Sequence, residues 1–138
     1  MKRGLMIVAG VALGVSAANG PAVAQETAVK LSKADLLELM PGQKVMHVSK
    51  AGNTRHWTNE ADGSLFASWA PIITGSGKFG GSGKGTWNIS DDGRYCVKID
   101  WTRAPEKWCR FIFRSGNDYS MGGSDDPAAE REKLGLQK

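Results

Sequence analysis

Residues 85–101 read GTWNISDDGRYCVKIDW. Within 94–101 the apolar residues occupy every second position, as is typical of a β-strand with one buried face. The apolar set is therefore expected to point inward: Tyr95, Val97, Ile99 and Trp101. Asp-Asp-Gly at 91–93 supplies a turn, because glycine adopts positive φ without steric cost. The stretch predicts an antiparallel hairpin of 85–90 with 94–101.

Working outward, short β-prone runs recur roughly every ten residues and are separated by turn residues. The expected strands are 44–49, 54–59, 64–70, 85–90, 94–101, 107–114 and 119–121. This pattern predicts a mainly β fold, an antiparallel meander of about seven strands that forms a curved sheet or a small lipocalin-like barrel.

One short helix is expected on each side of the meander. Ser32 can cap a helix that has Asp35 near its positive end and that stops at Pro41-Gly42. In the C-terminal tail, Asp-Asp-Pro at 125–127 favours the start of a peripheral helix, and Gly135 its end.

The N-terminus has the pattern of a cleavable secretory signal. Lys2 and Arg3 precede an apolar stretch, and Ala22-Val23-Ala24 fits a cleavage site. The stretch runs into Asn-Gly-Pro at 19–21 and is short for a membrane anchor. We expect a signal at 1–24, a flexible leader at 25–30, one β-rich domain at 31–121 and a tail at 122–138. The mature protein would be periplasmic or secreted, without stable membrane insertion.

Removing 24 of the 138 residues leaves 114, the size of one domain. The chain has 18 basic and 14 acidic residues, and two of the basic ones lie in the signal, so the mature charge is +2. A nucleic-acid-binding domain normally has a clustered basic face, so no nucleic-acid partner is expected. We expect a monomer.

Cys96 and Cys109 would enter an oxidising compartment, where they can form one intramolecular disulfide. A metal site or a catalytic thiol is poorly supported, because no C-x-x-C motif is present and neither His47 nor His56 has ligand-like spacing to the cysteines. If the cysteines are direct cross-strand partners, Phe111 and Phe113 share the outward face with Lys98. Either a bulge then shifts the register or the helix covers that second face; we expect two-sided cover.

Arg55, His56, Trp57 and Trp69 are the candidate ligand-binding residues. The first three combine a cation, a titratable ring and an aromatic surface, and the five tryptophans could line a groove or fill the core. No serine or carboxylate can be placed beside His56 from sequence, and the paired aspartates at 91–92 and 125–126 fit turn and cap chemistry. We expect no catalytic residue, no metal and no cofactor, and thus no enzyme.

Residues 74–85 contain Gly-Ser-Gly-Lys twice. The spacing does not fit a phosphate-binding loop, so we interpret the segment as a flexible hairpin connection. Its candidate interaction residues are Lys78, Phe79 and Lys84.

Residues 85–96, Trp108-Cys109 and the closing 116–119 carry a G-x-W strand, a D-G turn, a cysteine and then W-C. With the preceding helix and the Asp62-Gly63 hairpin, this pattern over 31–121 resembles small exported proteobacterial proteins grouped as a domain of unknown function. The resemblance implies a Gram-negative envelope protein with bridged cysteines and no established activity, and it assigns no catalytic residue.

The leading hypothesis is a non-enzymatic exported domain that binds a small apolar or glycan ligand. The alternative is a protein-interaction module, such as an inhibitor of an envelope hydrolase or protease, with the glycine-rich segment inserting into its partner.

Overall fold

The computed structural model describes residues 27–71 and 80–138. The expected signal, residues 25 and 26 of the leader, Lys78 and Phe79 lie outside the described residues. Nine strands and one helix occur in the described chain, and every strand pairing is antiparallel. The strands are β1 (Val29–Lys30), β2 (Lys44–Val48), β3 (Thr54–Thr58), β4 (Ser64–Ala70), β5 (Gly81–Ile89), β6 (Tyr95–Trp101), β7 (Pro105–Ser115), β8 (Asp118–Gly122) and β9 (Glu132–Gln137).

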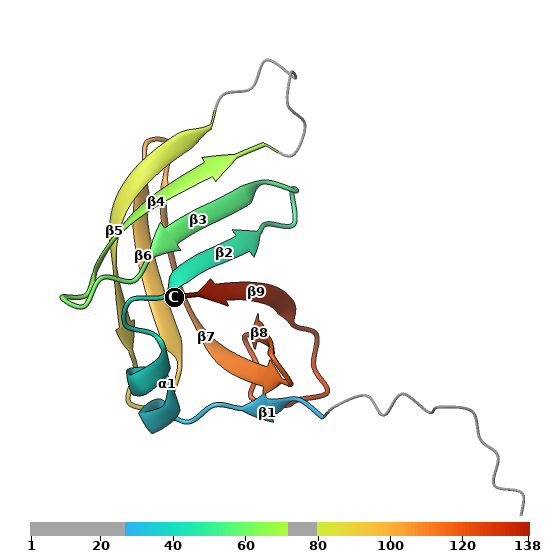
Figure 1. Ribbon diagram of the computed structural model, residues 1–138. Helices are drawn as coiled ribbons and strands as arrows, with labels where there is room; N and C mark the ends of the chain where they lie inside the picture. The colour runs from blue at the N-terminus through green and yellow to red at the C-terminus, as the bar shows by residue number, and fades with distance from the viewer. Residues whose placement is uncertain (1–26, 72–79) are drawn as a thin grey trace, which may run out of the picture.

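Strands β2 to β9 form a closed barrel of eight strands (Figure 1). From β2 to β8 each strand pairs with the next one in the chain. Strand β8 also pairs with β9, which follows after a longer connection, and β9 pairs with β2 and so closes the barrel. Strand β1 is additional and pairs with β7. The expected mainly β, antiparallel fold is confirmed.

The expected C-terminal helix is wrong, because residues 132–137 form β9 instead. Leu134 is buried within the barrel, and β9 pairs with β2 on one edge and β8 on the other. Closing the barrel satisfies both edges and buries an apolar side chain, which outweighs a weak local helix preference. Val29 and Lys30, assigned above to a flexible leader, form β1.

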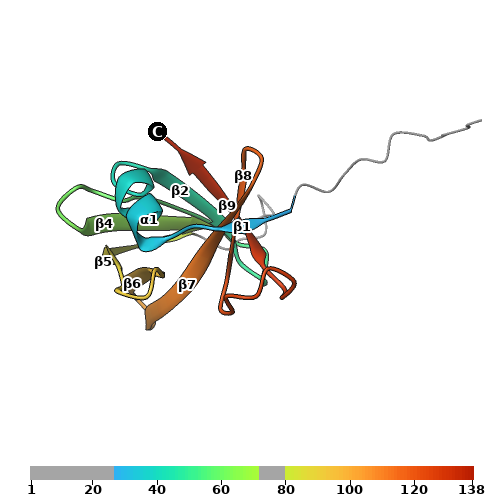
Figure 2. The same cartoon turned by 90° about the horizontal axis from the view of Figure 1, so that it is seen from below.

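Helix α1 (Lys33–Leu39) lies at one end of the barrel, as Figures 1 and 2 show. The side chain of Ser32 accepts a hydrogen bond from the Asp35 amide, and the Asp35 carboxylate accepts one from the Ser32 amide. This reciprocal capping fixes where the helix begins. Leu36 and Met40 are fully buried and close this end of the apolar core.

The hairpin that decides the fold forms as expected, with Gly93 at a φ of 82° in its turn. Tyr95, Val97 and Ile99 point into the core. Strand β5, however, begins at Gly81 rather than at 85. Its inward-facing glycines let neighbouring side chains pack directly against the backbone, since a Cβ on Gly81 would lie 2.5 Å from the Trp69 indole nitrogen. Residues 81–85, five of the twelve residues of the expected flexible connection, are therefore strand.

Cys96 and Cys109 are direct cross-strand partners and form a disulfide, with Cα atoms 4.0 Å apart. The register has no bulge at this point, and Phe113 is fully buried on the outward face. The expected cover of this face by the helix is wrong, because Lys30 of β1 and Arg131 lie over Phe111 and Phe113 instead. The Arg131 guanidinium lies 4.7 Å from the centre of the Phe113 ring.

Replacing both cysteines by serine should lower the free energy of unfolding by about 3 kcal/mol, because the bridge restrains a short loop in the unfolded chain. Urea denaturation of the double variant and of the oxidised protein measures the difference. An unchanged midpoint would show that the bridge does not constrain the unfolded chain.

Candidate functional site

Charged side chains and tryptophans meet inside the barrel, near the strand ends farthest from α1. The Arg55 guanidinium donates to the Glu106 carboxylate. The same carboxylate accepts from the indole nitrogens of Trp101 at 3.2 Å and Trp108 at 2.7 Å. Arg55 also lies over the rings of Trp57 and Trp101, at 5.7 and 5.6 Å from their centres. Glu106 is thus an acceptor for three donors in an aromatic setting.

A second carboxylate continues this network. Glu132 accepts from His47 Nε2 at 2.7 Å and from the Arg110 guanidinium at 3.0 Å. Arg55 approaches His47 Nδ1 at 3.5 Å, which joins the two halves. Arg110 in turn lies 4.7 Å from the centre of the Trp108 ring. We call these five residues the charged cluster: His47, Arg55, Glu106, Arg110 and Glu132.

The electrostatics of the charged cluster keep it neutral overall. Desolvation lowers the pKa of His47 and outweighs the attraction of Glu132, so the ring is uncharged, donates from Nε2 and can accept at Nδ1. Burial raises the pKa of Glu106, but hydrogen bonds from Arg55 and Trp108 hold it below its usual range. Burial likewise raises the pKa of Glu132, but the hydrogen bond from His47 and the charge of Arg110 outweigh it and hold this pKa below its usual range. Two arginines therefore balance two carboxylates.

Solvent reaches this cluster unevenly. The side chains of Glu106, Arg110 and Glu132 are 28%, 29% and 28% exposed, whereas that of His47 is 4% exposed. Arg110 and Glu132 also line a hollow of about 170 Å³ beside Lys50 and Glu130. The cluster is consequently an inward-facing polar surface that water, or a ligand, can contact.

Stability should fall in acid in two steps. His47 has a lowered pKa in the fold, so the unfolded chain binds more protons below its ordinary pKa of 6.5, and stability is lost as the pH falls through that value. Glu106 and Glu132 have lowered pKa values, so their contribution is present above the ordinary value of 4.5 and is lost as the pH falls below it.

Thermal unfolding across this pH range measures both steps. His47→Gln keeps a side-chain N–H donor and should remove the step near the pKa of histidine while leaving the one in stronger acid. A first step that persists in this variant would contradict the assignment to His47.

Trp57 belongs to the core beneath the cluster. Its indole nitrogen donates to the Tyr95 hydroxyl at 2.9 Å, Tyr95 donates to Asn59 Oδ1 at 2.5 Å, and Asn59 Nδ2 donates to the Met40 carbonyl at 3.1 Å. Trp57 is 3% exposed and Tyr95 is fully buried, which raises the tyrosine pKa. This chain of hydrogen bonds ties the end of α1 to the barrel interior.

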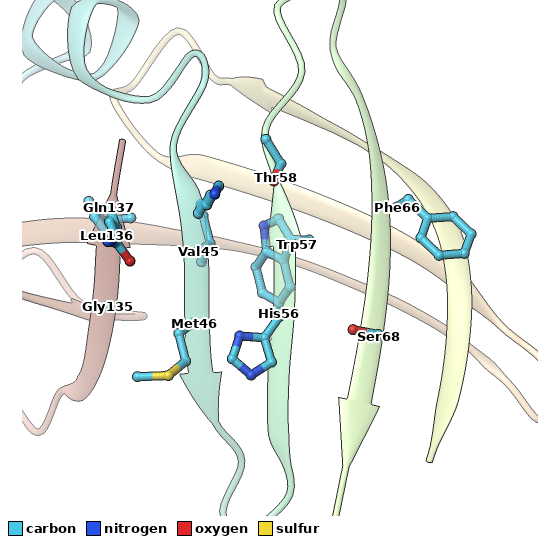
Figure 3. A pocket seen from close by; sticks show the side chains of 11 residues that line it. Val45, Met46, His56, Trp57, Thr58, Phe66, Ser68, Gly135, Leu136 and Gln137 are labelled. Atoms are coloured by element: carbon cyan, nitrogen blue, oxygen red, sulfur yellow. The ribbon is translucent and has the colours of Figure 1, made fainter.

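A larger open hollow, of about 610 Å³, lies on the outer surface over β9, β2, β3 and β4 (Figure 3). Figure 3 places Met46, His56 and Ser68 on successive strands, with Phe66 beyond them. Met46 lies against Gly135, where an added Cβ would be 3.3 Å from the Met46 Cβ. Met46 and Phe66 are 45% and 59% exposed. We call this the outer groove.

A protein-family model matches most of the chain. A model described as "Protein of unknown function (DUF995)" matches residues 6–109. The chain belongs to the DUF995 family. Neither the curated proteins nor the solved structures contain a match to it. The resemblance to a family without established activity is confirmed, and the match ends one residue before Arg110, so part of this DUF995 protein's charged cluster lies beyond it.

The structure separates the predicted ligand residues of this DUF995 chain. Arg55 is part of the charged cluster, and Trp69 is its cross-strand partner. Trp57 is core, and His56 points outward into the outer groove. Lys84 lies exposed on the outer face of β5. Sequence reasoning missed Glu106, Arg110 and Glu132. The alternation of side chains along β7 already placed Glu106, Trp108 and Arg110 on the face opposite to Cys109. No feature of the neighbouring sequence linked Glu132 to these residues.

Within 27–71 and 80–138, no group of three potential metal ligands gathers. In the same part of the chain, no helix is long and apolar enough to cross a bilayer.

Proposed function

We propose that the chain is an exported, non-enzymatic binding domain, and that a small glycan binds at the charged cluster. The observation that carries the proposal is the set of partly exposed charges, Glu106, Arg110 and Glu132, set among tryptophans inside a barrel. Convergent polar groups beside aromatic walls are the usual make-up of small-ligand sites.

The charges favour a neutral, hydroxyl-rich ligand over an apolar one. An apolar ligand would strip water from both carboxylates without replacing their hydrogen bonds, which is costly. A charged ligand would disturb the balance of two arginines against two glutamates. Sugar hydroxyls can donate to the carboxylates and accept from the guanidiniums, while indole faces cover the apolar side of a sugar ring.

The case for export rests on the N-terminal pattern and on the disulfide. Lys2 and Arg3 followed by an apolar stretch and Ala22-Val23-Ala24 fit a signal removed after Ala24. The Cys96–Cys109 bridge fits an oxidising compartment, such as the periplasm, and is rare in the cytosol. Mass spectrometry of protein recovered from a bacterial envelope fraction tests both, since it should begin at Gln25 and lack free thiols.

Tryptophan fluorescence tests ligand binding, with the exported chain titrated by a panel of neutral and amino-sugar oligosaccharides. We expect the neutral class to change the emission, and Trp101→Phe to weaken its binding about ten-fold through loss of an indole hydrogen bond and stacking area. Trp87→Phe is the matched control, because Trp87 donates to the Glu60 carbonyl at the α1 end of the barrel. A silent panel, or equal weakening by both variants, would reject the proposal.

The outer groove favours a second candidate, the protein-interaction module. Exposed Met46 and Phe66 around His56 form an apolar outer surface of the kind that protein partners cover. Inhibition of purified cell-wall hydrolases and proteases by the exported chain, and its loss in Met46→Asp, would support this candidate. Full activity of every hydrolase in its presence would remove it.

A further inference from the structure

Three lysines project together from the outer face of β5, β6 and β7. Lys98 and Lys107 are direct cross-strand partners, and Lys84 lies on the neighbouring strand opposite Asp100. All three are exposed, and none of them has an ion-pair partner within 27–71 and 80–138. Like charges directly opposite each other destabilise a sheet, so the pairing of Lys98 with Lys107 is unfavourable in the isolated protein.

An exposed aromatic ring borders the lysines. Phe66 is the cross-strand partner of Lys84 and is 59% exposed. Towards β1 the basic surface continues through Lys30, which lies over the Phe111 ring at 5.0 Å, whereas Arg94, at 5.8 Å from the centre of that ring, is paired with Asp92. The face thus combines several cations with a protruding apolar side chain.

Exposed carboxylates lie mostly elsewhere. Apart from Asp100, those of the described residues are on α1 and the turns beside it, as Asp62 and Asp92 are, or between Asp118 and Glu130. Most exposed carboxylates therefore lie away from the face that carries the three lysines, although the net positive charge of the whole protein is small. A one-sided field of this kind orients a protein towards an anionic surface.

We propose that this face, built from Lys84, Lys98, Lys107 and Phe66, docks peripherally on the phosphate headgroups of an anionic lipid bilayer. The inference rests on the proposed export, which would bring the chain to envelope membranes. Lysine ammonium groups pair with headgroup phosphates as point charges, and Phe66 enters the interface between headgroups and acyl chains. The docking relieves the repulsion between Lys98 and Lys107 and needs no spanning helix.

Co-sedimentation of the exported chain with vesicles tests the proposal. Binding to vesicles of phosphatidylglycerol and phosphatidylcholine in equal parts should be measurable at low salt, absent with phosphatidylcholine alone and lost at high salt. Each lysine is expected to contribute about five-fold, so Lys98→Gln with Lys107→Gln should weaken binding about 25-fold.

The matched control is Lys50→Gln with Lys133→Gln, which removes the same charge from the β2–β3 turn and from β9. Equal weakening by the two double variants would overturn the docking face, as would tighter binding to duplex DNA than to vesicles at equal phosphate concentration. If Phe66→Ser leaves vesicle binding unchanged, the proposed entry of Phe66 into the bilayer interface is overturned. Oligosaccharide titration of the Lys98 and Lys107 variant separates this proposal from the proposed function, because glycan binding should be unaffected.

Discussion

Replacing Glu106 by alanine is expected to lower the free energy of unfolding by about 3–5 kcal/mol. The side chain of Arg55 is 11% exposed and pairs with Glu106, so its charge would be left without a counterion in the barrel. The indole nitrogens of Trp101 and Trp108 would lose their acceptor as well. Urea denaturation followed by circular dichroism measures the loss.

A double-mutant cycle distinguishes this cause from loss of packing. Arg55→Met with Glu106→Leu replaces the pair by apolar side chains and should recover much of the stability lost in Glu106→Leu alone, since a buried ion pair is costly mainly when half of it is removed. If the double variant is less stable than Glu106→Leu by the full cost of Arg55→Met alone, the two side chains are not coupled.

Trp57→Ala is expected to cost about 3–5 kcal/mol, because it opens a large cavity in the core. It also removes the donor to the Tyr95 hydroxyl, within the hydrogen-bonded chain that reaches Met40. Thermal and urea unfolding should both show the loss.

Trp69→Ala is the comparison for Trp57. Trp69 is only partly buried and packs against the bare backbone of Gly81, so its removal should cost clearly less. A larger loss of stability for Trp69→Ala than for Trp57→Ala would contradict the placement of Trp57 in the core and of Trp69 at a partly exposed position.

Local sequence was sufficient for the parts of the fold that depend on neighbouring residues. The period of two in 94–101, the glycine turn at Gly93 and the cap at Ser32 each act within a few residues, and each formed as expected. For the cysteines the sequence left two possibilities open, direct pairing or a shifted register, and direct pairing is the one that formed. Strand β9 could not be predicted from local sequence, because it is extended to close two distant edges and its own residues favour neither state strongly.

The candidate site shows the same division. Arg55, His56 and Trp57 were grouped as neighbours in sequence, but consecutive residues of a strand point to opposite faces, so His56 was bound to part from the other two. Glu106 and Arg110 could have been assigned to the inner face from the alternation around Cys109. Glu132 could not, since its contact with His47 spans 85 residues.

The glycine-rich segment illustrates a compositional misinterpretation. Glycines at 81, 83 and 85 resemble a linker by composition, yet they alternate inward along β5. On Gly83 and Gly85 a Cβ would lie 2.8 and 2.0 Å from backbone carbonyl oxygens of β6. Their spacing of two, rather than their number, was the signal for a tightly packed strand.

The most direct test of the central claim follows the five indole N–H resonances of the 15N-labelled protein by NMR while an oligosaccharide that changes its fluorescence is added. If a glycan binds at the charged cluster, the resonances of Trp101 and Trp108 shift in a saturable manner, because both donate to Glu106, and that of Trp87 at the α1 end stays in place. A Trp87 resonance that shifts while those of Trp101 and Trp108 do not would contradict the account.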